Sequence, residues 1–485
     1  MTLTIKNTEL FIFNMHTRMP FKYGIANMTA LPHLFVKLTL DVDGTTYTGV
    51  AAEGLPPKWF TKNPGTTFVE DIDEMLNVIR SAAEYSLDTE PSETVFDLWR
   101  EIDAMQSADG MDANYPPLLY GLGTSLVERA LIDAFCKSAG VSFHHAVQRN
   151  LLGIELGELH DVLDGKTPAD YLPEQPRHTL IARHTVGLGD FLTDNEIPDD
   201  ERVDDGLPQS LTAVVNRYGI THFKIKLFGD PEKDIDRLTT IASIITQTGL
   251  TQYGFTLDGN ENFKEIPPFK KVWDSLNADE GLKAFMKHLL FVEQPFHRDV
   301  ALSDETGKAL LGWKDRPPII IDESDGEIES LPTALANGYA GTSHKNCKGV
   351  IHGIASACLI EHLRRENPDH PYIMSCEDLA NVGPVALLQD LAAVATLGID
   401  HAERNGHHYF AGLSMFPQDL QQAILAAHGD LYQGHPDGYP TLHIKQGIIN
   451  VTSLTQAPFG LAIDLDPAMF TPIDDWDNSW LVDLG

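Results

Sequence analysis

A series of short apolar segments alternates with amphipathic ones from about residue 178 onward, and this alternation constrains the fold more than any other feature. The apolar segments read THFKIKLF, YGFTLDGN, LLFVEQPF, PIIIDES, GTSHKN and YIMSCED. Between them lie segments such as DPEKDIDRLTTIASII, whose apolar residues recur at helical spacing. Nearly continuous apolar strands joined by helices are typical of a parallel sheet buried on both faces. The pattern fits either a barrel or an open, doubly wound α/β sheet.

Charged or amide side chains end these predicted strands, where a buried strand should not carry them. The first strand has two lysines two residues apart, so both lie on one face. Each later strand follows after roughly one strand-plus-helix unit, and parallel strands bring their carboxyl ends to one side of a sheet. We therefore expect the strand-end side chains to converge. In chain order they are Lys224 and Lys226, Asp258 and Asn260, Glu293, Asp322 and Glu323, and Lys345.

Three of these residues, Asp258, Glu293 and Asp322, predict a metal site. Burying even one unpaired carboxylate is costly, so three that converge need a cation. Mg²⁺ prefers oxygen ligands and keeps room for waters or a substrate carboxylate, with Mn²⁺ as the alternative ion. Lysines beside such an ion are expected to have lowered pKa values, as a general base requires at neutral pH. The arrangement suits removal of a proton next to a carboxylate, with the ion stabilising the enediolate.

The first 145 residues predict an α+β domain. Residues 8–52 alternate in places and are interrupted by a DVDG turn, which indicates an antiparallel meander. Residues 68–105 and 124–139 carry helical periodicity, and Gly140 is a plausible stop for the second of these segments.

Two regions show no clear periodicity. Residues 146–177 and 403–445 are rich in Pro, Gly, His and Asp, and we expect irregular insertions near an active-site face or a subunit contact. The histidine-rich stretch His401, His407 and His408 has no evident partners for a zinc site. We expect these histidines to be solvated or to lie at a subunit contact.

Composition excludes several classes of partner. The 485 residues include 35 Lys and Arg against 70 Asp and Glu, a formal net charge of −35. Such a field repels nucleic acids and anionic membrane surfaces. Four cysteines without metal-ligand spacing indicate reduced thiols, and no stretch approaches the ~20 apolar residues of a membrane span. We expect a soluble, cytoplasmic protein.

The series KIK, LDGN, VEQP, IDES and a late strand-end lysine resembles the enolase superfamily, in particular its mandelate racemase and muconate lactonizing enzyme group. TRMPFKYGIA is similar to that family's capping loop, and SLVERALIDAFCKSAGVSF to its Ala-Leu-x-Asp helix. The resemblance implies a modified TIM barrel, (β/α)7β, at 178–444. It also implies an N-terminal α+β capping domain at 1–145, completed by 445–485, with the insertion 146–177 between them.

The resemblance also implies roles for individual residues. Asp258, Glu293 and Asp322 match the three metal ligands. Lys226 matches the base on one face of the substrate, Lys345 matches the base on the opposite face, and Lys224 assists electrostatically. Positions that orient a ligand or a lysine are matched by Asn260 and Glu323.

Several assignments stay open. The chain reads Lys345-Asn-Cys-Lys348-Gly349 where the family has Lys-x-Gly-Gly, so Lys348 competes with Lys345 for the second base, and we favour Lys345. Tyr23, on the predicted capping loop, either contacts substrate or packs between domains. Glu377 and Asp378 either face the substrate or cap the following helix.

The predicted function is Mg²⁺-dependent proton abstraction from a small carboxylate substrate, with racemisation, epimerisation or cycloisomerisation favoured by two opposed lysines. The alternatives are an acid-sugar or other carboxylate dehydratase of the same superfamily, and a non-catalytic descendant of the barrel. A nucleotide-binding Rossmann enzyme is excluded because THFKIKLFGD has no Gly-rich turn. Since oligomers are common in the family, the resemblance also points to a homo-oligomer.

Overall fold

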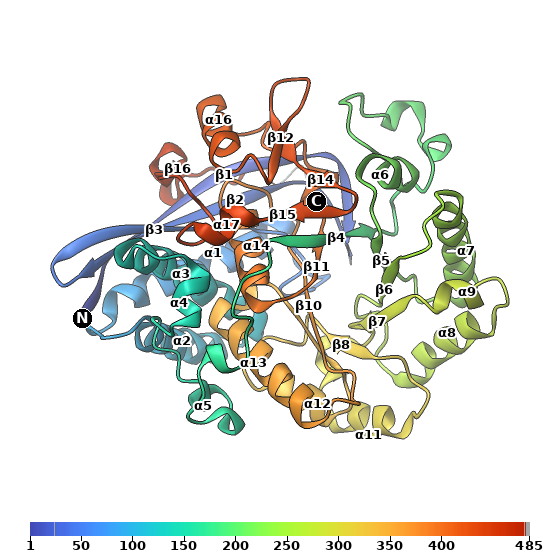
Figure 1. Ribbon diagram of the computed structural model, residues 1–485, viewed down its shortest axis with the longest axis horizontal. Coiled ribbons are helices and arrows are strands. Elements are labelled where there is room, and N and C mark those ends of the chain that lie inside the picture. Colours follow the sequence, from blue (N-terminus) through green and yellow to red (C-terminus); the bar gives the residue numbers. More distant parts are fainter. Residues whose placement is uncertain (24, 480, 482–485) are drawn as a thin grey trace.

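The computed structural model describes residues 1–23, 25–479 and 481 (Figure 1). Its N-terminal part contains an antiparallel sheet of β1 (Leu3–Tyr23), β2 (Ala26–Val42) and β3 (Thr45–Gly54). Asp43 and Gly44 turn the chain between β2 and β3 with positive φ angles of 50° and 87°, as a tight hairpin requires. The antiparallel meander predicted from residues 8–52 is thus confirmed. A short strand near the C-terminus, β16 (Thr471–Pro472), pairs with β1.

Helices α1 (Phe68–Asp88), α2 (Val95–Asp112) and α3 (Pro117–Ala139) pack beside this sheet (Figure 1). The segment 68–105, predicted as helical, is two helices, because Thr94 caps a new helix at Asp97 N after a break that contains Pro91. Gly140, with a φ of 64°, ends α3 as predicted. At Gly49 of β3, an added Cβ would lie 1.9 Å from Ala130 O, so only glycine allows α3 to pack this closely.

Seven consecutive strands form a parallel sheet in chain order from β4 to β10. Six of them, β5 to β10, coincide with the six apolar segments of the sequence pattern. An eighth strand, β11, pairs in parallel with the free side of β4. Among the described residues no backbone ladder joins β10 to β11, although Cys376 Sγ of β10 lies 3.5 Å from the backbone oxygen of His401 on β11. The strands are β4 (Thr179–Val186), β5 (His222–Lys226), β6 (Gly254–Asp258), β7 (Leu289–Glu293), β8 (Ile319–Ile321), β9 (Gly341–His344), β10 (Ile373–Cys376) and β11 (His401–Arg404).

Most helices of this part follow a strand and lie on the outer side of the sheet (Figure 1). They are α6 (Leu211–Tyr218), α7 (Pro231–Gln247), α8 (Ile266–Ala278), α9 (Lys283–Met286), α10 (Arg298–Ala301), α11 (Asp304–Gly312), α12 (Ser330–Ala336), α13 (Val350–Glu366) and α14 (Ala386–Leu397). The remaining elements are α4 (Phe143–Gln148), α5 (Leu156–Leu159), α15 (Gly406–Tyr409), α16 (Gln418–Ala427), α17 (Thr452–Gln456), β12 (Tyr432–Gly434), β13 (Pro440–Leu442), β14 (Ile444–Lys445) and β15 (Ile448–Asn450).

The expectation of an irregular insertion at 403–445 is wrong at its start. The segment HAER forms β11, in register with β4 from His401 to Arg404. Two of its four residues are charged, so it lacks the apolar run that marks the other strands. Of the three histidines, His408 is buried and His401 and His407 are partly buried, so they are not fully solvated, and the alternative of a subunit contact stays a prediction.

All four cysteines are buried and unpaired, in agreement with the prediction of free thiols. Within the described part of the chain, no helix is both long enough and apolar enough to cross a membrane.

Candidate active site

The register of the parallel strands brings the predicted strand-end residues to one side of the sheet. Lys226 of β5 lies opposite Asp258 of β6, and Asp258 lies opposite Glu293 of β7. Asp322 and Lys345 directly follow β8 and β9. The resulting cluster is almost fully removed from water, with side-chain exposures between 0% and 4% for Glu293, Asp258, Asp322 and Lys345.

Lys224 lies at the centre of the cluster. Its Nζ lies 2.8 Å from Glu293 Oε1, 2.6 Å from Glu377 Oε2, 3.0 Å from Glu403 Oε2 and 3.0 Å from Asp258 Oδ2. Burial alone lowers the pKa of this ammonium, but the surrounding carboxylates raise it well above the ordinary value. The raised pKa describes Lys224 facing four carboxylates, and the lowering expected beside a bound cation stays a prediction.

Two of these carboxylates extend the predicted set. Glu377 follows β10, and its contacts with Lys224 and Lys345 place it inside the cluster, whereas the sequence left it open between substrate contact and helix cap. Glu403 of β11 was missed altogether. Its position near the end of an eighth strand could have identified Glu403, but β11 itself was not recognised from the sequence.

Lys226 lies on the same face of β5, closer to the sheet edge. Its Nζ donates to Asp258 Oδ2 at 2.5 Å, and its side chain is 11% exposed. Asn260 does not contact this lysine in any described hydrogen bond; its backbone N–H donates instead to Asp258 Oδ1 at 2.7 Å. Asn260 has a φ of 45°, so the chain turns sharply here and returns the backbone to Asp258.

Lys345 and Lys348 both bind Asp322, but only Lys345 is among the described residues that line the cavity over the cluster. Lys345 Nζ donates to Asp322 Oδ2 at 2.6 Å and to Glu377 Oε2 at 2.8 Å. Lys348 Nζ donates to Asp322 Oδ1, Asp322 O and Ser343 O, all within 2.9 Å. Burial alone lowers the pKa of Lys345, but Asp322 and Glu377 raise it well above the ordinary value.

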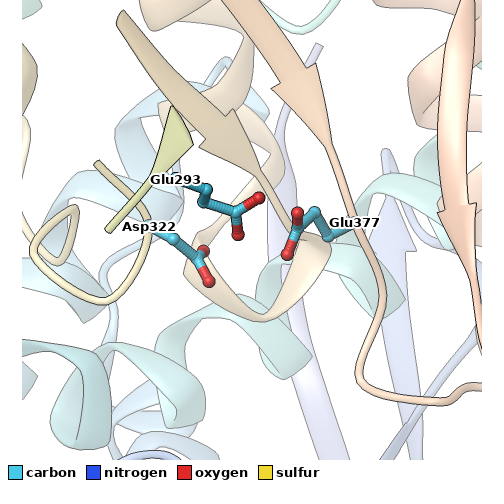
Figure 2. Close-up of side chains that lie close together, drawn as sticks. All are labelled: Glu293, Asp322 and Glu377. Carbon is cyan, nitrogen blue, oxygen red and sulfur yellow. The ribbon is translucent and has the colours of Figure 1, made fainter. Parts of the chain in front are cut away.

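Carboxylate oxygens of Glu293, Asp322 and Glu377 lie within 4.8 Å of one another and point to a common centre (Figure 2). Glu293 Oε2 is buried and has no hydrogen-bond partner among the described residues. Burial, followed by the charges of Glu377 and Asp258, raises the pKa of Glu293 well above its ordinary value. An oxygen-only set with an unpartnered carboxylate oxygen fits a hard divalent cation.

This closest set shares Glu293 and Asp322 with the predicted ligands but contains Glu377 where the sequence predicts Asp258. Asp258 Oδ2 lies 3.0 Å from Lys224 Nζ and 2.5 Å from Lys226 Nζ, so Asp258 binds both lysines of β5. The geometry therefore leaves two carboxylates that could complete the set.

Glu323 lines the same cavity and is 6% exposed. Its Oε2 has no hydrogen-bond partner in the described structure. Burial, followed by the neighbouring charges of Asp322 and Glu261, raises the pKa of Glu323 to about 8. The raised pKa favours the protonated form of this carboxyl group.

The cluster forms the floor of a cavity with about 640 Å³ of empty space, including its mouth. Phe21 of β1 and the segment after β3 contribute its upper wall. The ring of Trp59 lies with its centroid 5.0 Å from Lys345 Nζ, within range of a cation–π interaction. The side chain of Tyr23 lies outside the described part of the chain, so its predicted substrate contact has no structural counterpart here.

Solved structures share this fold over most of their length. A mandelate racemase/muconate lactonizing protein from Herpetosiphon aurantiacus is 15% identical, with a TM-score of 0.57 over 94% of this chain and 97% of that one. The N-succinyl Arg/Lys racemase from Bacillus cereus is 15% identical, with a TM-score of 0.54 over 94% and 98%. The dipeptide epimerase from Enterococcus faecalis, solved with Mg and L-Leu-L-Tyr, is 13% identical, with a TM-score of 0.56 over 94% and 99%.

No protein-family profile and no curated protein sequence matches the chain. The structural likeness shows that the chain has the fold of the mandelate racemase and muconate lactonizing proteins of the enolase superfamily. At 13% to 15% identity the likeness concerns the fold, and the chemistry depends on the residues of this chain.

Proposed function

We propose that the chain is a Mg²⁺-dependent enzyme of the enolase superfamily that removes the proton α to the carboxylate of a small substrate. One observation carries the proposal: Lys226 and Lys345, from β5 and the end of β9, flank a buried carboxylate cluster at the floor of a single cavity. The fold of the chain and the fit of the carboxylates to a divalent cation support it.

The domain arrangement that goes with this proposal has two parts. Strands β4 to β11 form a (β/α)7β barrel within 178–444, and the α+β part at 1–145 caps it. The pairing of β16 with β1 supports the inclusion of 445–485 in the capping part. The segment 146–177, with short helices only, connects the two.

The proposed reaction breaks the α-carbon–hydrogen bond of the substrate. A bound Mg²⁺, held by Glu293, Asp322 and either Asp258 or Glu377, would stabilise the negative charge that moves onto the substrate carboxylate. Lys226 Nζ takes the proton on one face, and Lys345 Nζ returns a proton on the other. Lys345 loses part of its stabilisation when Asp322 and Glu377 ligate a cation, so its ammonium becomes a better proton donor.

The other charged residues hold this geometry. Lys224 neutralises the carboxylates that face the barrel interior, and Lys348 fixes Asp322 through two of its oxygens. Two lysines on opposite sides favour a racemase, epimerase or cycloisomerase. A dehydratase would use the same first step, and its product would lack a molecule of water.

The proposal is tested by solvent exchange. Purified protein with Mg²⁺ is incubated in D₂O with a library of carboxylates, and deuterium at the α-carbon is followed by NMR. We expect exchange with at least one substrate and loss of exchange with EDTA. In Lys226→Ala and in Lys345→Ala we expect loss of exchange with the enantiomer whose α-proton faces the missing lysine. The exposed Lys233→Ala is the matched control and keeps the wild-type rate.

Exchange that persists with both enantiomers in Lys226→Ala and in Lys345→Ala would refute the assigned bases. No exchange with any carboxylate, together with no calorimetric binding of Mg²⁺ to EDTA-stripped protein, would favour a non-catalytic descendant of the barrel.

A further inference from the structure

Residues 56–62, which follow β3 and contribute the upper wall of the cavity, are called the roof below. A buried ion pair outside the carboxylate cluster holds the roof in place. Arg298, at the start of α10, donates Nε and Nη2 to the two carboxylate oxygens of Glu261 at 2.8 and 2.9 Å. The same guanidinium donates to Phe60 O at 2.7 Å and to Trp59 O at 2.9 Å. The Glu261 side chain is only 1% exposed, so this pair anchors the backbone of the roof to the barrel.

A lysine of the roof segment joins the same anchor. Lys62 Nζ lies 3.1 Å from Glu261 Oε2 and donates to Asn260 O at 2.6 Å. Glu261 thus receives hydrogen bonds or ion pairs from both the barrel and the roof. Because this anchor holds the backbone of Trp59, it also fixes the position of the Trp59 ring beside Lys345 Nζ.

A second aromatic ring, that of Phe21, also lines the cavity. Phe21 stacks on Tyr409 of α15, with centroids 4.0 Å apart and an interplanar angle of 25°. The Tyr409 hydroxyl donates to Asp190 at 2.7 Å, which holds the stack in place. Trp59 and Phe21 therefore face the cavity from two independently anchored segments.

The polar side chains of the upper wall are already engaged within the protein. Lys58 Nζ donates to Asn63 O, Thr66 Oγ1 and Asp71 Oδ1. Asp378 lies 3.0 Å from Arg404, and Asn405 Nδ2 donates to Glu403 at 2.9 Å. The apolar groups that remain on this wall are Phe21, Pro56, Trp59, Leu379 and Ala380.

We propose that the substrate is a carboxylate whose α-carbon carries an aromatic or branched alkyl group, seated between Trp59, Phe21 and Leu379. This inference rests on the proposed function for the position of the substrate carboxylate at the floor. A hydroxylated or charged substituent loses its hydrogen bonds to water at such a wall and gains none in return. Glu261 acts as a positioning residue, because it holds Trp59 through Arg298.

The preference for an apolar substituent is tested by measuring the affinity of two carboxylates that cannot react. Their binding reports on the cavity wall and does not depend on proton abstraction. The two probes lack an α-proton: 2-methyl-2-phenylpropanoate carries a phenyl group, and 2,2-bis(hydroxymethyl)propanoate carries two hydroxymethyl groups. Calorimetric titration of the Mg²⁺-loaded protein is expected to show at least about tenfold tighter binding of the phenyl probe, the range that one apolar group contributes in a pocket. Equal binding, tighter binding of the hydroxylated probe, or binding of neither would overturn the inference.

Tight binding of the phenyl probe without proton exchange on any substrate would instead refute the proposed function alone. Variants of Trp59 and Glu261 then test which residues cause the preference for the phenyl probe. Trp59→Ala and Glu261→Gln are expected to reduce the ratio of the two affinities at least about threefold, whereas Trp59→Phe keeps it, since an aromatic ring remains. Glu265→Gln, an exposed glutamate four residues from Glu261, is the matched control. An unchanged ratio in Trp59→Ala, in protein with wild-type secondary structure, would place the apolar subsite elsewhere and so refute the assignment.

Discussion

Replacement of Lys224 by methionine tests the charge balance of the buried cluster. The substitution keeps the length of the side chain but leaves four carboxylates without their shared cation. Removing one partner of a buried ionic network costs about 3 to 5 kcal/mol. With an unfolding entropy of about 2.1 cal/mol/K per residue, 485 residues give roughly 1 kcal/mol/K, so the melting temperature should fall by about 3 to 5 °C.

Differential scanning calorimetry at pH 7 with EDTA measures the effect, and Lys226→Met is the matched control. Lys226 lies on the same strand and the same face, but its side chain is 11% exposed and its ion pair is with Asp258. We expect a smaller drop, under about 2 °C. Equal drops in the two variants, or no drop in Lys224→Met, would refute the central role of Lys224.

Magnesium adds a second arm to this experiment. A cation held by the same carboxylates stabilises the folded state by about 2.7 kcal/mol at a hundredfold excess over its dissociation constant. We expect Mg²⁺ to raise the melting temperature of Lys224→Met more than that of the wild type, because the ion restores the missing charge. An equal response would show that the metal binds elsewhere.

Three further predictions follow from the site. Asp258→Asn and Glu377→Gln distinguish the two candidates for the third ligand. The variant that loses a true ligand should bind Mg²⁺ at least about tenfold more weakly in a calorimetric titration. Unchanged affinity in both variants would refute the site. Glu323, whose pKa is raised to about 8, keeps a proton in the folded state that the unfolded chain releases near pH 4.5, so wild-type stability falls as the pH rises between these values. Glu323→Gln removes this loss, so its free energy of unfolding should gain on that of the wild type increasingly from pH 5 to pH 8, by roughly 3 to 5 kcal/mol at the upper end. Melting temperatures measured across this pH range check the trend, and a constant difference would contradict the raised pKa. Thiol reagents should leave the native protein unlabelled and react only after unfolding, since burial raises the pKa of all four thiols, and fast labelling of the native state would be contrary to the structure.

The sequence predicted the parallel strands and the residues at their ends because each strand is apolar up to a charged terminus. Lys226, Asp258 and Glu293 could be placed side by side from the pattern alone, since neighbouring parallel strands end at one edge. The same logic failed at β11, where HAER has no apolar run and pairs with β4 through its backbone. Glu403 was missed for this reason.

The electrostatic state of the lysines could not be predicted from single residues. Lys345 has a raised pKa because Asp322 and Glu377 both contact it. The sequence placed Glu377 directly after β10 but left open whether its side chain faces the cluster or caps the following helix. The anchor between Arg298 and Glu261 was likewise invisible in the sequence. It depends on two loops that follow different strands and on backbone oxygens of a third segment.

The central claim is that Lys226 and Lys345 exchange protons with opposite faces of one α-carbon. Once a substrate is known, each pure enantiomer is incubated in D₂O with Mg²⁺ and either Lys226→Ala or Lys345→Ala, and α-deuterium is measured by NMR at early times. We predict that each variant loses exchange with a different enantiomer, since each lacks the base for one face. Loss of exchange with the same enantiomer in both variants, or retention with both, would contradict the two-base arrangement.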